Sequence, residues 1–220
     1  MLLEEMTKYV SKDLKVNFKN SIPICYSYSR NRKIGILGGS FNPAHIGHIH
    51  ITNTALTNLG LDEIWWLVAP QNRLKSSLDM ENFDKRLSYA RLLTKNISYI
   101  KVLDLEKKNQ LYATYKTVNF LNQRTRKVKF IWLMGSDILD NLNKWLYPNL
   151  IAQNIHIAVI SRPGYLNSFL NTSRVPNFGK KLKTIKSRII FHKKKPVWVF
   201  LKNKLLSISS SEIRKTKTYT

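Results

Sequence analysis

The stretch GGSFNPAHIGH, residues 38–48, concentrates glycine and histidine in a way that suits phosphate chemistry. Its two leading glycines let the backbone approach a ligand closely. His45 and His48 lie three residues apart, a spacing that brings two side chains to one side of a helix start, and Gly47 leaves space between them. A helix start also offers unpaired N–H groups and the positive end of the helix dipole. The stretch therefore predicts a phosphate-binding turn.

Two other interpretations of these histidines stay open at this point. His45, His48 and His50 could together ligate zinc, although no carboxylate or cysteine follows nearby. Alternatively, the histidines are structural residues near the start of a helix. His50 projects to a different face from His48, which favours a structural role for His50.

The glycine turn follows the first of several strand-like runs that alternate with helical segments. Apolar runs predict strands at 33–37, 63–69, 98–105, 129–135, 155–161 and 197–201. Helical spacing predicts helices at 83–93, capped by Asn82, and at 114–124. A further helix follows the turn, with an inner face made by Ile49, Thr52, Ala55, Leu56 and Leu59. This alternation predicts an α/β fold, doubly wound, with a mostly parallel sheet and helices on both faces.

The chain divides into an N-terminal extension, residues 1–31, and one domain over residues 32–220. Residues 162–195 are polar and basic, and we expect them to form a long surface excursion. In open α/β sheets, ligands bind beyond the carboxyl ends of the strands. The glycine turn comes directly after the first predicted strand, so it is expected at that edge.

Composition limits the class of protein. No apolar run in the 220 residues reaches the length of about 18 needed to span a bilayer. Glu4, Glu5 and Lys8 occupy positions where a signal peptide would need an apolar core, and Cys25 is a lone cysteine. These features predict a cytoplasmic protein without an internal disulfide and without a membrane partner.

The formal net charge of +24 attracts polyanions in general. No Asp or Glu occurs between Asp140 and Glu212, and residues 180–195 contain eight Lys or Arg. The basic residues form no recognisable nucleic-acid-binding motif. We therefore favour compositional drift together with small phosphorylated ligands, and we do not expect nucleic acid to be the functional partner. The sequence leaves open a homo-oligomer.

Two signatures resemble a known superfamily. GGSFNPAHIGH resembles the signature of the HxGH nucleotidyltransferases, and ISSSEIR, residues 208–214, is similar to the ISSTxIR motif at their second helix start. Between them, four blocks resemble the nicotinate-nucleotide adenylyltransferase family: LDEIWWLVAPQNRLK (61–75), LYATYKT (111–117), WLMGSDILDNLNKW (132–145) and SRPGY (161–165). Their order and separation are more specific than any block alone.

The resemblance implies catalytic roles for His45, His48 and Arg214. The histidines would hold the ATP phosphates and stabilise the charge that builds on the α-phosphate and the departing pyrophosphate. Arg214, with Ser210 and Ser211, would hold the triphosphate from the opposite helix.

Further ATP contacts follow from the same resemblance. Gly39, Ser40 and Phe41 would shape the loop around the phosphates, and Gly135 and Asp137 would meet the adenosine. Magnesium would arrive mainly on the ATP phosphates, so no protein metal site is implied.

For the second substrate, nicotinate mononucleotide, the resemblance implies three contacts. Thr114 would recognise the nicotinate carboxylate, Trp145 would stack on the pyridine ring, and Lys75 would approach the phosphate. Thr114 and Asp137 also have an interpretation as helix caps, and Trp145 as a core residue. The rival functions are pantetheine-phosphate adenylyltransferase, a cytidylyltransferase, and a non-catalytic basic nucleic-acid-binding protein on the same fold.

Overall fold

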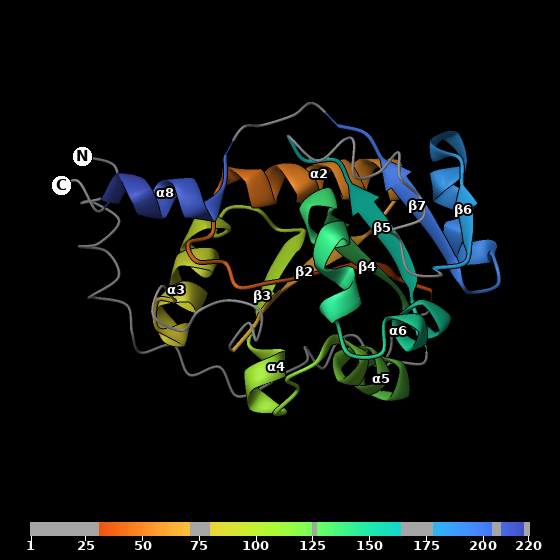
Figure 1. Ribbon diagram of the computed structural model, residues 1–220. Helices are drawn as coiled ribbons and strands as arrows, with labels where there is room; N and C mark the ends of the chain where they lie inside the picture. Colours follow the sequence, from red (N-terminus) through yellow and green to blue (C-terminus); the bar gives the residue numbers. More distant parts are fainter. Residues whose placement is uncertain (1–30, 71–79, 125–126, 164–177, 204–207, 218–220) are drawn as a thin grey trace.

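The computed structural model describes residues 31–70, 80–124, 127–163, 178–203 and 208–217. Its centre is a seven-stranded sheet in the order β3-β2-β1-β4-β5-β7-β6, and every pairing in it is parallel (Figure 1). The strands are β1 (Lys33–Gly39), β2 (Glu63–Val68), β3 (Ile100–Leu103), β4 (Lys129–Gly135), β5 (His156–Ile160), β6 (Lys180–Leu182) and β7 (Val197–Leu201). The expected parallel α/β sheet is confirmed.

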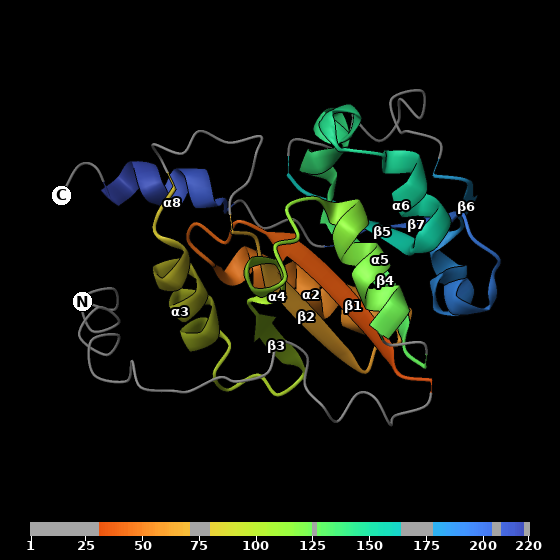
Figure 2. The same cartoon turned by 90° about the horizontal axis from the view of Figure 1, so that it is seen from below.

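Helices cover both faces of this sheet. One face packs against α2 (Ile46–Leu59), α3 (Phe83–Leu93) and the 3-10 helix η4 (Thr184–His192). The other packs against α4 (Leu105–Lys108), α5 (Thr114–Arg124), the 3-10 helix η2 (Ser136–Lys144) and α6 (Pro148–Asn154), and Figure 2 shows α4, α5 and α6 on this side. The last helix, α8 (Ser210–Lys217), lies beside the start of α2 (Figure 1).

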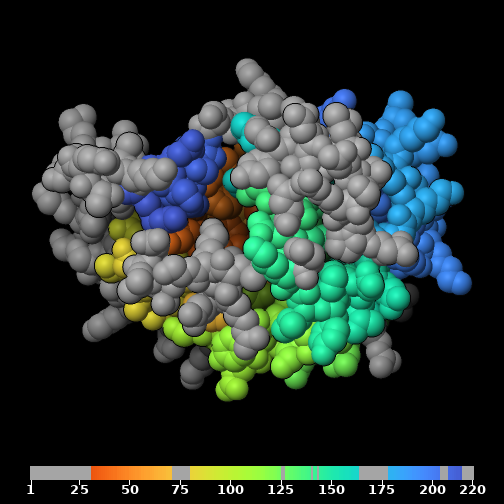
Figure 3. Space-filling view, viewed as in Figure 1, coloured from red at the N-terminus to blue at the C-terminus, as the bar shows by residue number. Residues whose placement is uncertain are grey.

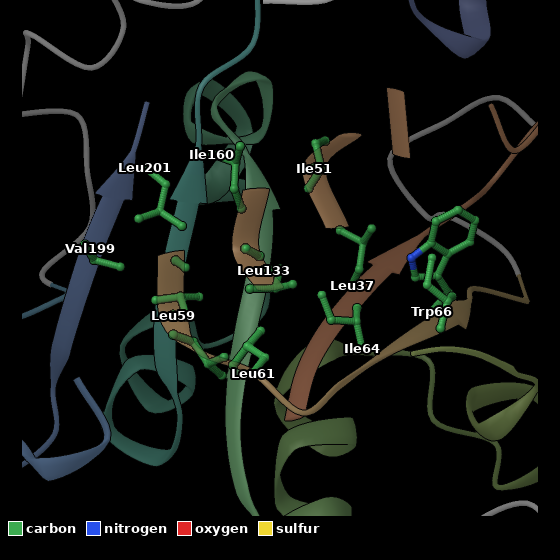
Figure 4. Packing of buried hydrophobic residues seen from close by; sticks show 14 of the residues in the cluster. Leu37, Ile51, Leu59, Leu61, Ile64, Trp66, Leu133, Ile160, Val199 and Leu201 are labelled. Atoms are coloured by element: carbon green, nitrogen blue, oxygen red, sulfur yellow. The ribbon is translucent and has the colours of Figure 1, made fainter. Parts of the chain in front are cut away.

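The strands divide their side chains between two cores because successive residues point to opposite faces. In β1, Ile34 and Ile36 join the core under α5, whereas Leu37 joins the core under α2. Figure 4 shows part of the second core, where Leu37 lies near Ile51 of α2. Both faces are buried, which explains why the strand sequences are almost continuously apolar.

The strand order reverses between β1 and β4, because β2 and β3 extend to one side and β5, β7 and β6 to the other. Such a reversal point is where open α/β sheets bind ligands. Gly38 lies at this point in β1, and a Cβ there would come within 2.8 Å of the Trp132 ring on β4. The glycine is therefore needed for the close approach of the two strands.

Several predicted boundaries were wrong. The third strand ends at Leu103 rather than at 105, because α4 begins at Leu105. On α2, the expected inner-face residues Ile49 and Leu56 pack against the core although they are partly buried, and the buried Ile51 was missed. No separate element was expected for η2 or α6.

The predicted surface excursion at 162–195 was wrong over its described C-terminal part. Residues 178–195 contain β6 and η4, and Leu182, Ile190 and Phe191 are buried in the core under α2. A three-residue strand in which two residues are lysines has no periodicity that would reveal it. The lysines have a structural use there, since β6 is a sheet edge and charged side chains protect an edge from pairing with another chain.

Within the described ranges, no helix has the length and apolar character required to cross a bilayer.

Candidate active site at the carboxyl ends of β1 and β4

A cavity of about 520 Å³ opens at the carboxyl ends of β1 and β4, within the usual size range of small-molecule sites. Figure 3 shows surface from the first strand and helix exposed between α8 and the segment that follows β4. Of the residues expected in the site, those that line this cavity are Gly39, Ser40, Phe41, His48, Thr114, Gly135, Asp137, Trp145, Ser210 and Ser211. Lys75 lies outside the described residues.

The two histidines form a reciprocal cap at the start of α2. Nδ1 of His45 accepts a hydrogen bond from the Gly47 N–H at 3.1 Å, and Nδ1 of His48 accepts one from the His45 N–H at 3.2 Å. Their ring centroids lie 4.0 Å apart. Because each Nδ1 accepts, the proton of each neutral ring is on Nε2, so both rings offer an N–H donor.

His45 differs from His48 in burial. His48 lines the cavity, whereas His45 lies beneath it and is 5% exposed. Burial lowers the pKa of His45 to about 4, with a smaller contribution from the Arg162 cation and opposition from Glu212. His45 is therefore a neutral donor at pH 7. Its Nε2 is buried and has no hydrogen-bond partner within the described part of the chain.

Phe41 anchors the loop between β1 and α2. Its φ of 47° is in the left-handed region, which residues with a side chain rarely adopt. The ring is buried and stacks on Trp66 at a centroid distance of 4.9 Å, and the His48 ring centroid lies 4.8 Å from it. Packing thus compensates for the backbone strain and fixes the loop beside His48.

Arg86 of α3 also fixes this loop, and sequence reasoning missed it. The side chain is almost fully buried and donates hydrogen bonds to four backbone carbonyls, those of Ser40, Ala69, Pro70 and Glu81. These carbonyls belong to the loops after β1 and β2, both of which contribute to the cavity. Arg86 therefore shapes the site without lining it.

The N-terminus of α8 closes another side of the cavity. Ser209 and Glu212 exchange hydrogen bonds of 2.8 and 3.2 Å that cap this helix. Ser210 donates to the Pro43 carbonyl, and Arg214 donates to the Asn42 carbonyl. The two helix starts are therefore joined, and their N–H groups and dipoles face one site.

Asp137, which follows β4, forms an ion pair with Arg162. The Arg162 Nε is 3.6 Å from Oδ1 of Asp137. The backbone N–H of Arg162 donates to the Ser136 hydroxyl at 2.8 Å. A Cβ at Gly135 would collide with both side chains. Arg162 belongs to the SRPGY block, yet the resemblance gave it no role.

The wall opposite the histidines comes from α4, α5 and η2. Thr114 is the first residue of α5, and Trp145 follows η2 and packs partly against the core. Glu106 of α4, a third residue that sequence reasoning missed, lines the cavity beside them. The predicted strand at 98–105 ended just before Glu106, so nothing marked it as part of the site.

Arg214 is the one described site residue besides His45 that does not line the cavity. Its guanidinium contacts the loop before α2 and the Ser211 hydroxyl at 3.4 Å. It thus lies behind the helix start rather than in the open volume.

Comparison with known proteins agrees with this geometry. Residues 36–216 match the family model for cytidylyltransferase-like proteins. A protein of Agrobacterium fabrum described as a "probable nicotinate-nucleotide adenylyltransferase" is 35% identical over 182 residues, which cover 82% of this chain and 97% of that protein. A protein of Parvibaculum lavamentivorans with the same description is 46% identical over 133 residues, covering 60% of this chain and 66% of the relative.

The fold is shared with a solved Plasmodium falciparum structure, a nicotinic acid mononucleotide adenylyltransferase complexed with NaAD. The TM-score is 0.62 at 22% identity, with 84% of this chain and 83% of that chain covered. The family model and the relative that is 35% identical over nearly its whole length show that the chain belongs to the cytidylyltransferase-like family and, within it, to the nicotinate-nucleotide adenylyltransferases.

Proposed function

We propose that this chain transfers the AMP part of ATP to nicotinate mononucleotide, giving nicotinic acid adenine dinucleotide and pyrophosphate for NAD synthesis. An oxygen of the mononucleotide phosphate forms a bond to the α-phosphorus of ATP. The bond between that phosphorus and the α–β bridging oxygen breaks, and pyrophosphate leaves with the electron pair. The attacking oxygen is already ionised, so no strong general base is needed, and catalysis rests on positioning and charge stabilisation.

One observation supports the proposal most strongly, namely the buried Nε2–H of His45 without a partner in the described structure. An unpaired buried donor costs on the order of 1 to 3 kcal/mol. A phosphate oxygen bound between the starts of α2 and α8 would satisfy it. Such a donor needs no reorganisation when negative charge develops on the phosphates.

The remaining contacts divide the cavity between the substrates. His48, Ser210 and Ser211 belong to the phosphate end, and Gly135 and Asp137 belong to the adenosine contact. Thr114 and Trp145 form the opposite wall, where the pyridine ring would stack and its carboxylate would meet backbone donors. Gly39, Ser40 and Phe41 shape the loop between these regions, and Arg214 supports it.

A magnesium ion bound to ATP would neutralise part of the phosphate charge. The donor set fits an ion carried by the nucleotide, since Asp137 pairs with Arg162 at 3.6 Å. Within the described residues, no group of three or more His, Cys, Asp or Glu side chains could hold a metal ion. Phosphate oxygens and water would then supply its ligands.

The function is tested by pyrophosphate release from ATP with magnesium and one acceptor at a time. The acceptors are nicotinate mononucleotide, nicotinamide mononucleotide and phosphopantetheine. We expect the highest kcat/KM with nicotinate mononucleotide. Release with phosphopantetheine alone would overturn the assignment of the Thr114 and Trp145 wall. Release with none, from folded protein that shifts an RNA probe at physiological salt, would favour the nucleic-acid-binding alternative.

Gly47→Ala tests the geometry of the His45 donor. A Cβ at position 47 would lie 2.8 Å from Cε1 and Nδ1 of His45 and 3.0 Å from Cγ2 of Ile208, so the ring must move and lose its hydrogen bond. Misplacement of this size is expected to lower kcat/KM about 100-fold. The measurement is steady-state pyrophosphate release.

Ile46→Ala is the matched control, because Ile46 is adjacent and 53% exposed. Its kcat/KM is expected to stay within about twofold of the wild type, as for most exposed positions. Equal activities for Gly47→Ala and Ile46→Ala would mean that the position of the His45 ring does not matter for the reaction.

A further inference from the structure

A buried carboxyl group, that of Glu106, lies at the end of the cavity formed by α4 and α5. The residue is 8% exposed and lines the cavity together with Thr114. The proposed reaction gives this group no task, although a carboxyl is costly to bury without a partner cation. A role for Glu106 in the choice of substrate rests on the proposed function.

Hydrogen bonds fix Glu106 relative to Thr114. Its Oε1 accepts from the Thr117 hydroxyl at 2.9 Å, and its backbone carbonyl accepts from the Leu111 N–H at 2.8 Å. The Ala113 carbonyl accepts from the Thr117 N–H at 3.2 Å. Leu111 and Ala113, which precede α5, are therefore held by hydrogen bonds to Glu106 and to its partner Thr117.

The two lysines that follow Glu106 on α4 pair with other carboxylates. On α4 itself, Lys107 pairs with Asp84 and Lys108 pairs with Asp104, each at 3.1 Å. Strand β2, which packs against α4, presents Trp65, Leu67 and the buried Glu63 on this face, and Glu63 pairs with Arg32 at 3.3 Å. The other titratable groups on α5 are Tyr115, Lys116 and Arg124, and those around the cavity are His48, Tyr112, Asp137, Lys144 and Arg162.

Glu106 is therefore a carboxyl without an ion pair in the described structure. Burial raises the pKa of Glu106 to about 7, and the Thr117 hydroxyl opposes this rise. The group changes charge near neutral pH, whereas an ordinary glutamate is ionised there. Its second oxygen, Oε2, has no hydrogen-bond partner among the described residues.

We infer that Glu106 determines which pyridine substituent the cavity accepts. In its neutral form the carboxyl donates a hydrogen bond to the carboxylate of nicotinate mononucleotide. In its ionised form it repels that carboxylate and instead accepts a hydrogen bond from the carboxamide of nicotinamide mononucleotide. The two substrates differ only in this substituent, so the protonation of Glu106 acts on their ratio.

The sign of the pH effect is set by the charge of Glu106. Below about pH 7 the neutral form prevails and favours nicotinate mononucleotide, and above about pH 7 the ionised form removes that preference. All titrations of ATP, of the shared mononucleotide phosphate and of the phosphate-binding residues affect both acceptors alike. They cancel in the ratio of the two kcat/KM values.

The experiment measures this ratio, nicotinate over nicotinamide mononucleotide, from about pH 6.5 to about pH 8.5. For the wild type, the ratio is expected to fall about 25-fold over this range if only the nicotinate activity follows the neutral fraction of a group with a pKa near 7, and up to about 100-fold if the nicotinamide activity follows the ionised fraction. Glu106→Gln keeps an oxygen that accepts from Thr117 but cannot ionise, so its ratio is expected to be independent of pH. If Glu106 had only a structural role, Glu106→Gln would lower the activities with both mononucleotides together. The ratio of the two kcat/KM values would then equal that of the wild type at every pH.

Thr117→Val supplies a second variant that keeps the carboxyl. Loss of the Thr117 hydrogen bond removes the interaction that lowers the pKa of Glu106. The fall of the nicotinate over nicotinamide ratio is therefore expected to begin at a higher pH than in the wild type. A flat wild-type ratio would overturn the inference while leaving the proposed function intact. Failure of both mononucleotides to support pyrophosphate release would instead overturn the proposed function itself.

Discussion

Replacing His48 with alanine is expected to lower kcat for pyrophosphate release by about 100- to 1000-fold. The ring lines the cavity at the third position of α2, and its Nδ1 accepts from the His45 N–H, which leaves Nε2–H as the donor. Removal of one preorganised donor to a developing charge costs roughly 3 to 4 kcal/mol of transition-state stabilisation. Because this donor acts mainly on the transition state, KM for nicotinate mononucleotide should change little.

His50→Ala is the control for this variant. His50 lies on the same helix but is not among the cavity-lining residues, and we expect its kcat to stay within about twofold of the wild type. The cap at the start of α2 loses one partner in His48→Ala, at a cost of about 1 kcal/mol in unfolding free energy. Urea unfolding of both variants separates this loss from catalysis. A His48→Ala enzyme with a kcat near the wild-type value would exclude His48 from the chemistry.

Replacing Arg86 with methionine is expected to destabilise the fold by about 3 to 5 kcal/mol. Methionine fills much of the buried volume, but four backbone carbonyls lose their donor, and leaving buried polar groups unpaired is expensive. The loops that begin at Ser40 and Ala69 would relax, so activity should fall even where the protein remains folded. The measurement is the free energy of unfolding in urea, with the slope checked for a two-state transition.

Lys85→Ala is the neighbouring control on α3. Its side chain is exposed and pairs with Glu81 at 3.2 Å, an arrangement worth less than about 1 kcal/mol. If Arg86→Met and Lys85→Ala unfold at the same urea concentration, the buried arginine does not organise the site. Arg86→Lys should give an intermediate loss, because an ammonium group cannot reach carbonyls on both sides as a guanidinium does.

The strands were predictable because nearly all of their residues are apolar and buried. Most helices were predictable because apolar side chains recur on one face over several turns. The boundaries of β4, β7, α3 and α5 agree with the predicted ranges, and Asn82 caps α3 by accepting from the Asp84 N–H. In contrast, β6 has three residues and two exposed lysines, so its burial depends on Phe178 and Leu182 meeting distant parts of the sheet. Local sequence contains no trace of such contacts.

The site divides in the same way. The glycine and histidine turn was marked by its residues and spacing, whereas Ser210, Ser211 and Arg214 were expected only from the resemblance of ISSSEIR to a known motif. The structure places His48, Ser210 and Ser211 around one cavity, and their roles stay predictions. Arg86, Glu106 and Arg162 were missed because each is one charged residue among many in this basic chain. Arg86 matters through a hydrogen bond to Ser40, 46 positions away, and Glu106 through its burial. Neither property is visible before the chain is folded.

The central claim is that the bond between the α- and β-phosphates of ATP breaks and that AMP passes to the mononucleotide. It is tested most directly by ATP labelled on the α-phosphate, incubated with magnesium, nicotinate mononucleotide and the full chain, with products separated and weighed by mass spectrometry. We expect one labelled dinucleotide, with the mass of nicotinic acid adenine dinucleotide, for each pyrophosphate released. Labelled ADP with free phosphate, or labelled AMP without dinucleotide, would contradict this claim.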